Sequence, residues 1–246
     1  MLTKGQYRLV GQKGEWSSIQ AATGLNGKLY TVDGSGYLAC IDPQAESIKK
    51  LSAQSGWASK FMVNAYSRIF DIESSGTVYS IDAEDGSYAK VSNDGQWGTA
   101  KAVTTSRGRL LIRDENGKLY ELDPWTKEYR EIGTSTWTSS WLVEGGTDTL
   151  VSIESSGTIY RINTKTGNYD KVGKDNEWEG SLAVAGRGGS LFIFSSTGTV
   201  YSVNIWDGSY VQIGESTGWS PKFAVMGDYY LYTFENDGSL YEIAVY

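Results

Sequence analysis

The sequence contains no histidine, one cysteine and three prolines in 246 residues. Without histidine, the chain lacks the commonest general base and the commonest metal ligand of proteins. The single cysteine, Cys40, excludes an internal disulfide and cannot build a cysteine–histidine nucleophile. Its apolar neighbours in the run YLACI predict a small buried side chain. These absences argue against an enzyme, so we predict a non-catalytic protein with no metal and no cofactor.

The sequence also lacks long apolar runs and an excess of positive charge. No stretch approaches the 18 or so apolar residues that a membrane-spanning helix needs, and the N-terminal MLTKGQYRLV has no apolar core of a signal peptide. The net charge of −7 disfavours binding to phosphate backbones and to anionic membranes. We therefore expect no nucleic-acid partner and no membrane insertion. A cytoplasmic location is favoured over a secreted one, which leaderless export or a trimmed leader would still allow.

What the sequence does contain is a repeat. A tryptophan recurs every 40 or 41 residues, at Trp16, Trp57, Trp97, Trp137, Trp178 and Trp219. A glycine that opens a G-x-[LIV]-[YA] run follows the same spacing, at Gly36, Gly76, Gly117, Gly157, Gly198 and Gly238. A fixed period of about 40 residues indicates a propeller or a solenoid.

Each copy holds four short apolar runs separated by turn residues, which predicts four strands. Alternation of apolar and polar residues in the second and third runs is typical of half-buried strands. Asp85-Gly86 and Asp207-Gly208 supply the turn chemistry of hairpins. The sixth residue after each tryptophan is small or β-branched, which suits a crowded innermost strand: Ala22, Val63, Val103, Val143, Val184 and Val225. No segment has the caps and period of a helix.

The two ends of the sequence complement each other. The last copy lacks a fourth run, and the segment from Tyr7 to Gly11 matches the fourth run of the other copies. Pairing these ends would remove an open sheet edge. We predict an all-β, six-bladed β-propeller with four antiparallel strands per blade, closed by the N-terminal strand. We expect it to be one domain over residues 1–246, and a monomer.

Alternate connections of a blade lie on opposite ends, so the tryptophans share a face with the second-to-third connections. There an acid recurs in five of six copies, at Asp33, Glu73, Asp114, Glu154 and Glu235, with Ser195 in the sixth. Indole faces beside carboxylates suit a sugar, because pyranose C–H groups stack on indole and carboxylates accept hydroxyl hydrogen bonds. The alternatives are that the tryptophans fill the space between blades and that the acids bond turn amides. The Asp114 segment lacks the spacing of a calcium loop.

Two further tryptophans stand outside the repeat, on the opposite face. Trp125 and Trp206 occupy equivalent third-to-fourth turns. Exposed tryptophans mark interaction sites, so we predict a protein contact there. The alternative is that the two side chains fold down onto the blades.

The strings GWASKF and GWSPKF, preceded by [VI]-G and followed by G-x-L-Y, resemble the repeats of the tachylectin family. The resemblance implies a β-propeller lectin or cell-surface recognition protein. Tachylectin repeats are longer, number five and carry an inserted D-N-W segment, so the sugar-contact residues of that family do not transfer. A second resemblance, through GTIYRINTKTGNY, is to quinoprotein-type propeller repeats.

Three functions follow as hypotheses. The first is a multivalent lectin that binds carbohydrate or glycoconjugate through the repeated tryptophans and acids. The second is a protein–protein interaction scaffold centred on Trp125 and Trp206. The third is a quinoprotein-like or hydrolytic enzyme, against which the recurrence of the acids once per blade argues, since a catalytic pair should break the symmetry.

Overall fold

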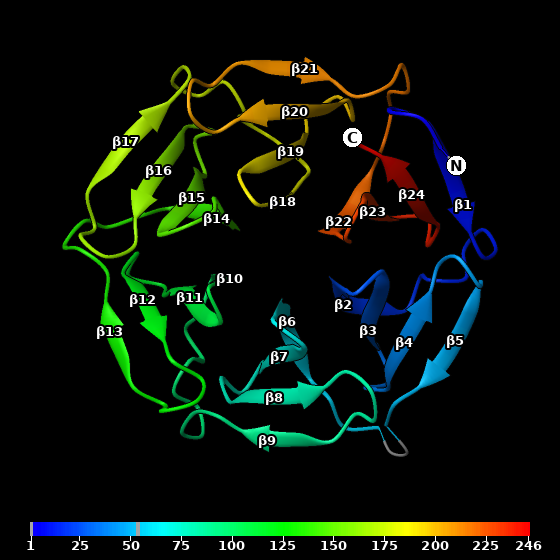
Figure 1. The fold of residues 1–246 in the computed structure, drawn as a ribbon, viewed down its shortest axis with the longest axis horizontal. Coiled ribbons are helices and arrows are strands. Elements are labelled where there is room, and N and C mark those ends of the chain that lie inside the picture. Colours follow the sequence, from blue (N-terminus) through cyan, green and yellow to red (C-terminus); the bar gives the residue numbers. More distant parts are fainter. Residues whose placement is uncertain (1, 53–54) are drawn as a thin grey trace.

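The computed structural model describes residues 2–52 and 55–246, and these residues form six four-stranded antiparallel sheets. The sheets stand in a ring around a central axis (Figure 1). The described part of the chain contains strands and turns and no helix. The predicted six-bladed β-propeller is confirmed.

Blades 1 to 3 follow one another from the N-terminal side. Blade 1 comprises β2 (Ile19–Leu25), β3 (Lys28–Asp33), β4 (Leu38–Asp42) and β5 (Ser47–Lys50). Blade 2 comprises β6 (Ser59–Ala65), β7 (Arg68–Glu73), β8 (Val78–Asp82) and β9 (Tyr88–Lys90). Blade 3 comprises β10 (Ala102–Ser106), β11 (Arg109–Arg113), β12 (Leu119–Leu122) and β13 (Tyr129–Glu131).

Blades 4 to 6 complete the ring. Blade 4 comprises β14 (Ser139–Glu144), β15 (Thr149–Glu154), β16 (Ile159–Asn163) and β17 (Tyr169–Val172). Blade 5 comprises β18 (Ala183–Arg187), β19 (Ser190–Phe194), β20 (Val200–Asn204) and β21 (Tyr210–Gln212). Blade 6 comprises β22 (Pro221–Met226), β23 (Tyr230–Glu235), β24 (Leu240–Ala244) and, from the other end of the chain, β1 (Tyr7–Val10).

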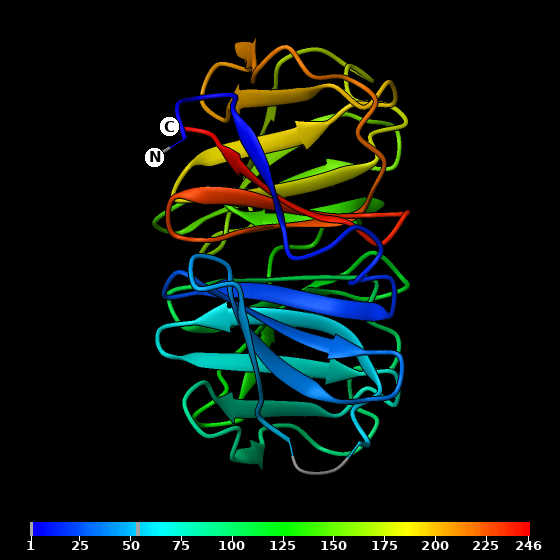
Figure 2. The same cartoon turned by 90° about the vertical axis from the view of Figure 1, so that its right-hand side faces the viewer.

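The ring closes as the sequence predicts. β1 pairs antiparallel with β24, with Tyr7 opposite Ile243 and Val10 opposite Leu240. Figure 2 shows β1 beside β24 on the outside of the disc. The Arg8 Nε donates to Glu242 Oε2 at 2.5 Å, so an ion pair joins the two ends of the chain in addition to the backbone ladder.

The two sequence markers meet at one joint. In all six blades the carbonyl of the marker glycine accepts the backbone amide of the tryptophan that opens the next blade, at 2.8–3.3 Å. The glycine at this joint also has no room for a side chain, because a Cβ on Gly76 would lie 2.0 Å from the Gly98 nitrogen. This shared joint explains why the glycines and tryptophans keep the same period.

The innermost strands are the predicted first runs, and the small or β-branched row that includes Val63 and Val143 lines the channel. β10 begins only at Ala102, because the Ala100 amide is turned back to the Trp97 carbonyl at 3.0 Å. The cores lie between neighbouring sheets; Ile72 of blade 2 and Ile112 of blade 3, for example, share one cluster. Cys40 is buried, as predicted.

Candidate functional site

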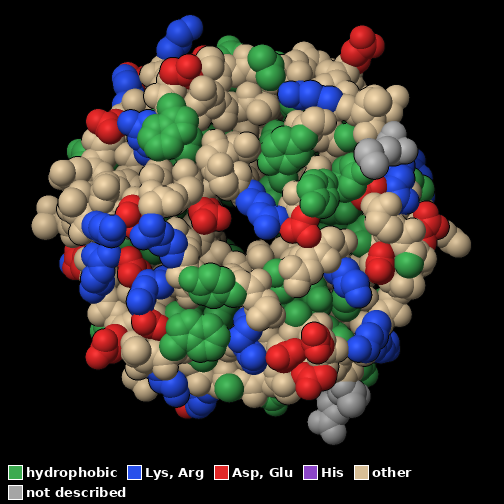
Figure 3. All heavy atoms as spheres, viewed as in Figure 1, with side chains coloured by type: hydrophobic (Ala, Val, Ile, Leu, Met, Phe, Trp, Pro, Cys, Tyr) green, Lys and Arg blue, Asp and Glu red, His purple; other side chains and the backbone are tan. Residues whose placement is uncertain are grey.

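The connections divide the surface into two faces. The row face is formed by the blade-to-blade connections that carry the six repeated tryptophans, together with the second-to-third hairpins that carry the acids. The aromatic face is formed by the first-to-second hairpins and the third-to-fourth turns. Figure 3 views the aromatic face, where hydrophobic side chains and paired charges surround the mouth of the channel.

Four of the six repeated tryptophans are buried between blades. Trp16, Trp97, Trp137 and Trp178 are 5–7% exposed, and Trp57 and Trp219 are half-buried. Packing between blades therefore accounts for most of this row, and the four buried indoles present no open face to a sugar.

Edge-to-face aromatic contacts hold these indoles. Trp137 meets Tyr160 and Tyr169 with ring centroids 5.5 and 5.0 Å apart. The same pair of contacts recurs in blades 2, 3, 5 and 6. Such contacts add to the apolar burial of each ring. Blade 1 departs from the pattern, because Ala39 and Ile48 stand where the other blades have tyrosines.

Most of the acids bond groups of their own blade. The Oδ1 atoms of Asp33 and Asp114 each accept two turn amides at 2.8–3.0 Å. Glu154 accepts the amide and the hydroxyl of Thr138 at 2.6 and 2.7 Å. Glu235 accepts the Ser220 amide at 2.6 Å, and burial raises the pKa of its carboxyl. These four carboxylates already serve as internal acceptors.

Glu73 is the exception in the acid row. Its nearest donors among the described residues are the Ala58 amide at 3.5 Å and the Ser75 hydroxyl at 3.4 Å, so these residues bond its oxygens only weakly. Glu73 lines a cleft of about 810 Å³ together with Trp57, Tyr79 and Tyr88. Blade 2 thus combines a half-buried row tryptophan with an acid that has acceptor capacity left.

Beneath Glu73 lies a buried carboxyl that the sequence analysis missed. Asp71 is 0% exposed, and neither of its oxygens nor the Ser59 hydroxyl has a hydrogen-bond partner among the described residues. Burial raises the pKa of Asp71 to about 7, with the nearby Ser59 hydroxyl opposing the rise and the charge of Glu73 adding to it. At the same place in blade 4, Ser152 makes a hydrogen bond to Ser139 at 2.5 Å. An alignment of the copies would have revealed this acid at a position that the other blades fill with Thr, Ile or Ser.

Trp125 and Trp206 lie on the aromatic face and are 58% and 63% exposed. Each reaches over the preceding blade instead of its own. Trp125 meets Phe70 of blade 2 edge-on at 6.4 Å, and Trp206 stacks with Arg161 of blade 4, with the guanidinium carbon 4.6 Å from the ring centroid.

Three exposed tyrosines accompany them, and the sequence analysis did not identify these. Tyr66 and Tyr229 occupy first-to-second hairpins, and Tyr246 follows β24; they are 63–75% exposed. An aromatic residue at a hairpin tip was the available signal, because a tip has no neighbouring strand to cover it. Tyr66 even adopts a positive φ of 54°, which is rare for a bulky residue.

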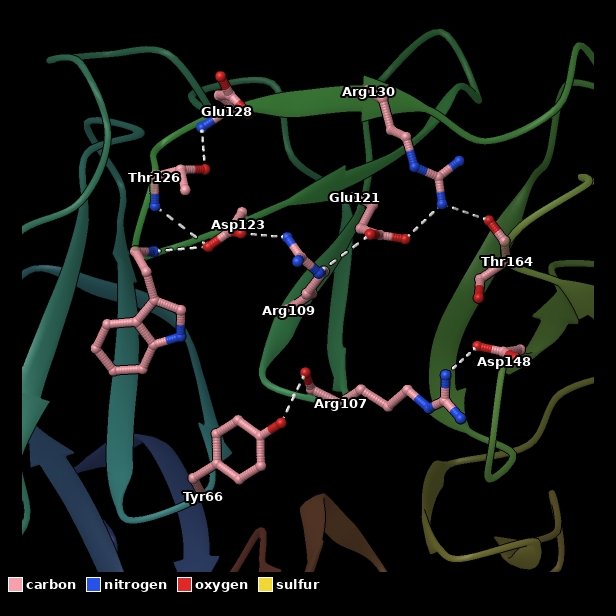
Figure 4. A network of polar contacts seen from close by, with 11 residues as sticks. Tyr66, Arg107, Arg109, Glu121, Asp123, Thr126, Glu128, Arg130, Asp148 and Thr164 are labelled. Atoms are coloured by element: carbon pink, nitrogen blue, oxygen red, sulfur yellow. Dashed lines mark hydrogen bonds and ion pairs between the residues drawn. The ribbon is translucent and has the colours of Figure 1, made fainter.

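Part of the aromatic face is bound together by ion pairs. Figure 4 shows Arg109 and Arg130 converging on Glu121, and Arg107 reaching Asp148 across the seam between blades 3 and 4. The Arg130–Glu121 and Arg107–Asp148 contacts are both 2.7 Å long. These charges neutralise one another and fasten the two blades.

The central channel encloses about 430 Å³. Trp141 lines it, at a position whose side chain changes from blade to blade. Toward the aromatic face the wall carries Glu144, and burial raises the pKa of this carboxyl while Arg187 opposes the shift. Arg187 is itself paired with Asp228 at 2.5 Å.

Neither a metal cluster nor a membrane helix emerges within residues 2–52 and 55–246. These residues contain no group of three or more His, Cys, Asp or Glu side chains placed to hold a metal ion. They also contain no helix long and apolar enough to cross a membrane.

No protein-family model and no curated protein matches the chain. Solved structures do match its fold. A protein of unknown function from Bacteroides thetaiotaomicron matches with a TM-score of 0.72 and 13% identity, over 97% of this chain and 75% of that one. The computationally designed Ika8 protein matches with 0.58 and 15%, over 92% and 70%. BamB from Moraxella catarrhalis matches with 0.55 and 15%, over 92% and 85%.

At these identities the similarity is one of fold. The neighbours support a β-propeller and do not extend to the tachylectin family. Because propellers host many unrelated functions, function has to be argued from the sites above.

Proposed function

We propose that this propeller is a non-catalytic carbohydrate-binding protein, and that its sugar site is the cleft beside Trp57 and Glu73. One observation carries the proposal: blade 2 leaves both a tryptophan and an acid of the repeated rows accessible. Trp57 is half-buried, and Glu73 makes only long contacts with the described residues.

The chemistry of the cleft suits a sugar. A partly open indole offers a face for pyranose C–H groups, and a carboxylate accepts hydroxyl donors through strong charge-assisted hydrogen bonds. Tyr79 and Tyr88 fix the indole edge-on, with centroids 5.5 and 5.0 Å away. The cleft volume of about 810 Å³ falls within the range of small-ligand sites.

The proposal reduces the number of sugar sites that the sequence predicts in the repeated row. At Trp97, Trp137 and Trp178 the indole is buried, and at Trp219 the partner acid Glu235 is engaged by the Ser220 amide. A lectin with many weak sites, whose affinities combine through avidity, would need these indoles and this carboxylate to be accessible to the sugar. We therefore expect the row to supply one site.

A glycan array with purified protein tests the proposal. We expect binding to a coherent class of sugars, and at least about a tenfold loss of affinity, equal to about 1.4 kcal/mol, in Trp57→Ala and in Glu73→Gln. Glu235→Gln is the matched control, because that acid belongs to the same row but bonds its own blade, so its binding should stay at the wild-type level. A blank array with folded protein would overturn the proposal.

The non-catalytic part of the proposal has its own test. It is supported by the lack of histidine and by the internal hydrogen bonds of the acids. Incubation with chromogenic glycosides should release no product above the buffer rate. Turnover that disappears in Glu73→Gln would instead assign a hydrolase.

A protein-interaction scaffold is the second candidate function, favoured by the exposed aromatics of the aromatic face. Tyr66 lies on blade 2 and Trp125 reaches over that blade to Phe70, and both are more than half exposed. Tyr and Trp are enriched at binding hot spots. A Tyr66→Ala/Trp125→Ala double variant should lose any captured protein partner while it keeps its sugar binding; unchanged capture would remove this candidate.

A further inference from the structure

The exposed indole of Trp206 is held in place by an arginine of the neighbouring blade. The Arg161 guanidinium carbon lies 4.6 Å from the centre of the indole, within cation–π range. One face of the ring is thus occupied by the protein. Since the side chain is still 63% exposed, the other face is turned to solvent.

Arg161 is itself fixed in place. Its Nη2 donates to Asp170 Oδ2 at 3.1 Å, and its Nη1 donates to the Ile205 carbonyl at 3.4 Å. The guanidinium therefore bridges β17 of blade 4 and the turn that carries Trp206. Its charge is neutralised by Asp170, so the platform as a whole is close to neutral.

The turn beneath Trp206 has little freedom to move. The Trp206 amide donates to Asn204 Oδ1 at 2.8 Å. Gly208 packs so tightly on blade 4 that a Cβ there would lie 2.4 Å from the Gly173 Cα. A ring held in this way loses little conformational freedom when a ligand stacks on it, which favours binding.

Beside the indole is a cleft of about 480 Å³ with a polar rim. Asn163, Thr166, Asn168 and Asp170 line it along with Trp206. Asn163 Oδ1 accepts the Lys165 and Thr166 amides, so its NH₂ group remains as a donor. The rim offers amide donors and acceptors, a hydroxyl and an exposed carboxylate, which match the alternating donors and acceptors of a polyhydroxylated ring.

We propose that Trp206, Arg161 and this polar rim form a second carbohydrate subsite, which binds a neutral hexopyranose with its C–H face on the outer face of the indole. The inference shares its ligand class with the proposed function but rests on different residues, at the seam of blades 4 and 5. The two sites also differ in position, since the Trp57 cleft lies between blades 1 and 2 and the Trp206 cleft between blades 4 and 5. One molecule could then bridge two glycans, which is where a gain from linked sites would arise.

Trp125 provides a control within the same chain. It occupies the equivalent turn of blade 3 with a similar exposed fraction, but it meets Phe70 edge-on instead of stacking on an arginine. Blades 3 and 5 thus both have an exposed tryptophan in this turn, but of the two only Trp206 is stacked on an arginine.

The test is ¹⁹F NMR of protein labelled with 5-fluorotryptophan. The nine tryptophans give separate probes, and Trp206→Phe and Trp57→Phe assign the two relevant signals. The ligands are the methyl glycosides of glucose, galactose and mannose, and N-acetylglucosamine, titrated into the millimolar range. We expect the Trp206 signal to shift saturably with at least one of them, and Trp206→Ala to weaken that binding at least about tenfold.

Trp125→Ala and Trp57→Ala should leave the Trp206 titration unchanged. A Trp206 signal that no ligand moves would overturn this inference, and so would an equal loss in Trp125→Ala. If the Trp57 signal responds while that of Trp206 does not, this inference fails and the proposed function stands. If only the Trp206 signal responds, the subsite stands and the Trp57 cleft fails. The exposed position of Trp206 keeps its variants foldable, and circular dichroism checks this.

Discussion

Asp71 makes the stability of the propeller depend on pH in a way that one substitution should abolish. Its carboxyl is 0% exposed and has no hydrogen-bond partner among the described residues. At the equivalent position blade 4 has Ser152, which forms hydrogen bonds with Ser139 and Glu154. The perturbation is therefore Asp71→Ser, which gives blade 2 the arrangement of blade 4.

The magnitude follows from the pKa of Asp71, which rises from 3.8 to about 7 on folding. Below pH 3.8 both folded and unfolded states hold the proton, so the group costs nothing. Between pH 4 and 7 the unfolded chain ionises while the folded chain keeps its proton, and the free energy of unfolding falls by up to about 1.4 kcal/mol per pH unit. Above pH 7 the loss levels off at about 4 kcal/mol.

Urea unfolding at pH 4, 5, 6, 7 and 8, followed by tryptophan fluorescence, measures this. We expect the difference in free energy of unfolding between Asp71→Ser and wild type to grow with pH up to about pH 7, toward about 4 kcal/mol, and then to stay constant. The other buried acids, such as Glu235, are present in both proteins, so their contributions cancel. Glu84→Gln, an exposed acid on a turn of the same blade, is the matched control and should track wild type.

Parallel curves for wild type and Asp71→Ser would refute the reasoning. They would mean that Asp71 titrates alike in the folded and unfolded states. A second readout guards against a change in the unfolded state: the ¹³C chemical shift of the Asp71 carboxyl in folded protein should titrate near pH 7.

Three other outcomes are expected. Arg8→Met should lower the free energy of unfolding by about 3–5 kcal/mol, because Glu242, 1% exposed, loses its charge partner; a loss under about 1 kcal/mol in urea titrations would contradict this. Trp137→Ala should cost about 3–5 kcal/mol through the cavity it leaves, whereas Trp206→Ala should cost less than about 1 kcal/mol, and calorimetry would disprove the assignment if the two matched. The Cys40 thiol, whose pKa burial raises, should resist a disulfide reagent until the protein unfolds; rapid labelling of native protein would show that it is accessible.

The sequence predicted the architecture well because the fold is repeated. The period of Trp97 and Gly117 and their equivalents gave six blades, and the match of Tyr7–Gly11 to a fourth run gave the closure. Each of these patterns reflects a local requirement of the fold, such as a glycine at a point with no room for a Cβ. The requirement is the same at every junction between blades, so the residue repeats.

The sites could not be predicted equally well, since they depend on how one blade differs from the others. Trp57 and Trp97 look alike in sequence, yet one is half-buried and the other buried. Glu73 and Glu154 also look alike, but Ala58 and Asp71 stand where blade 4 has Thr138 and Ser152, both of which donate to Glu154. The exposure of a side chain and the hydrogen bonds it can still accept depend on such neighbouring residues. The repeat period carries no information about them. The stack of Arg161 on Trp206 joins residues 45 apart from two blades (206 − 161), beyond any local pattern.

The pairing of β1 with β24 has a consequence for the order in which the molecule folds. Tyr7 lies opposite Ile243, 236 residues further along the chain (243 − 7). Five blades can complete their own sheets from consecutive strands, but the sixth must wait until the last strand has been synthesised. Closing so long a loop costs entropy before its contacts form, and such non-local pairing is slow. Until then a nascent ring exposes the edge of one sheet to other chains, so the hazard of misassembly is concentrated in the last step of its folding.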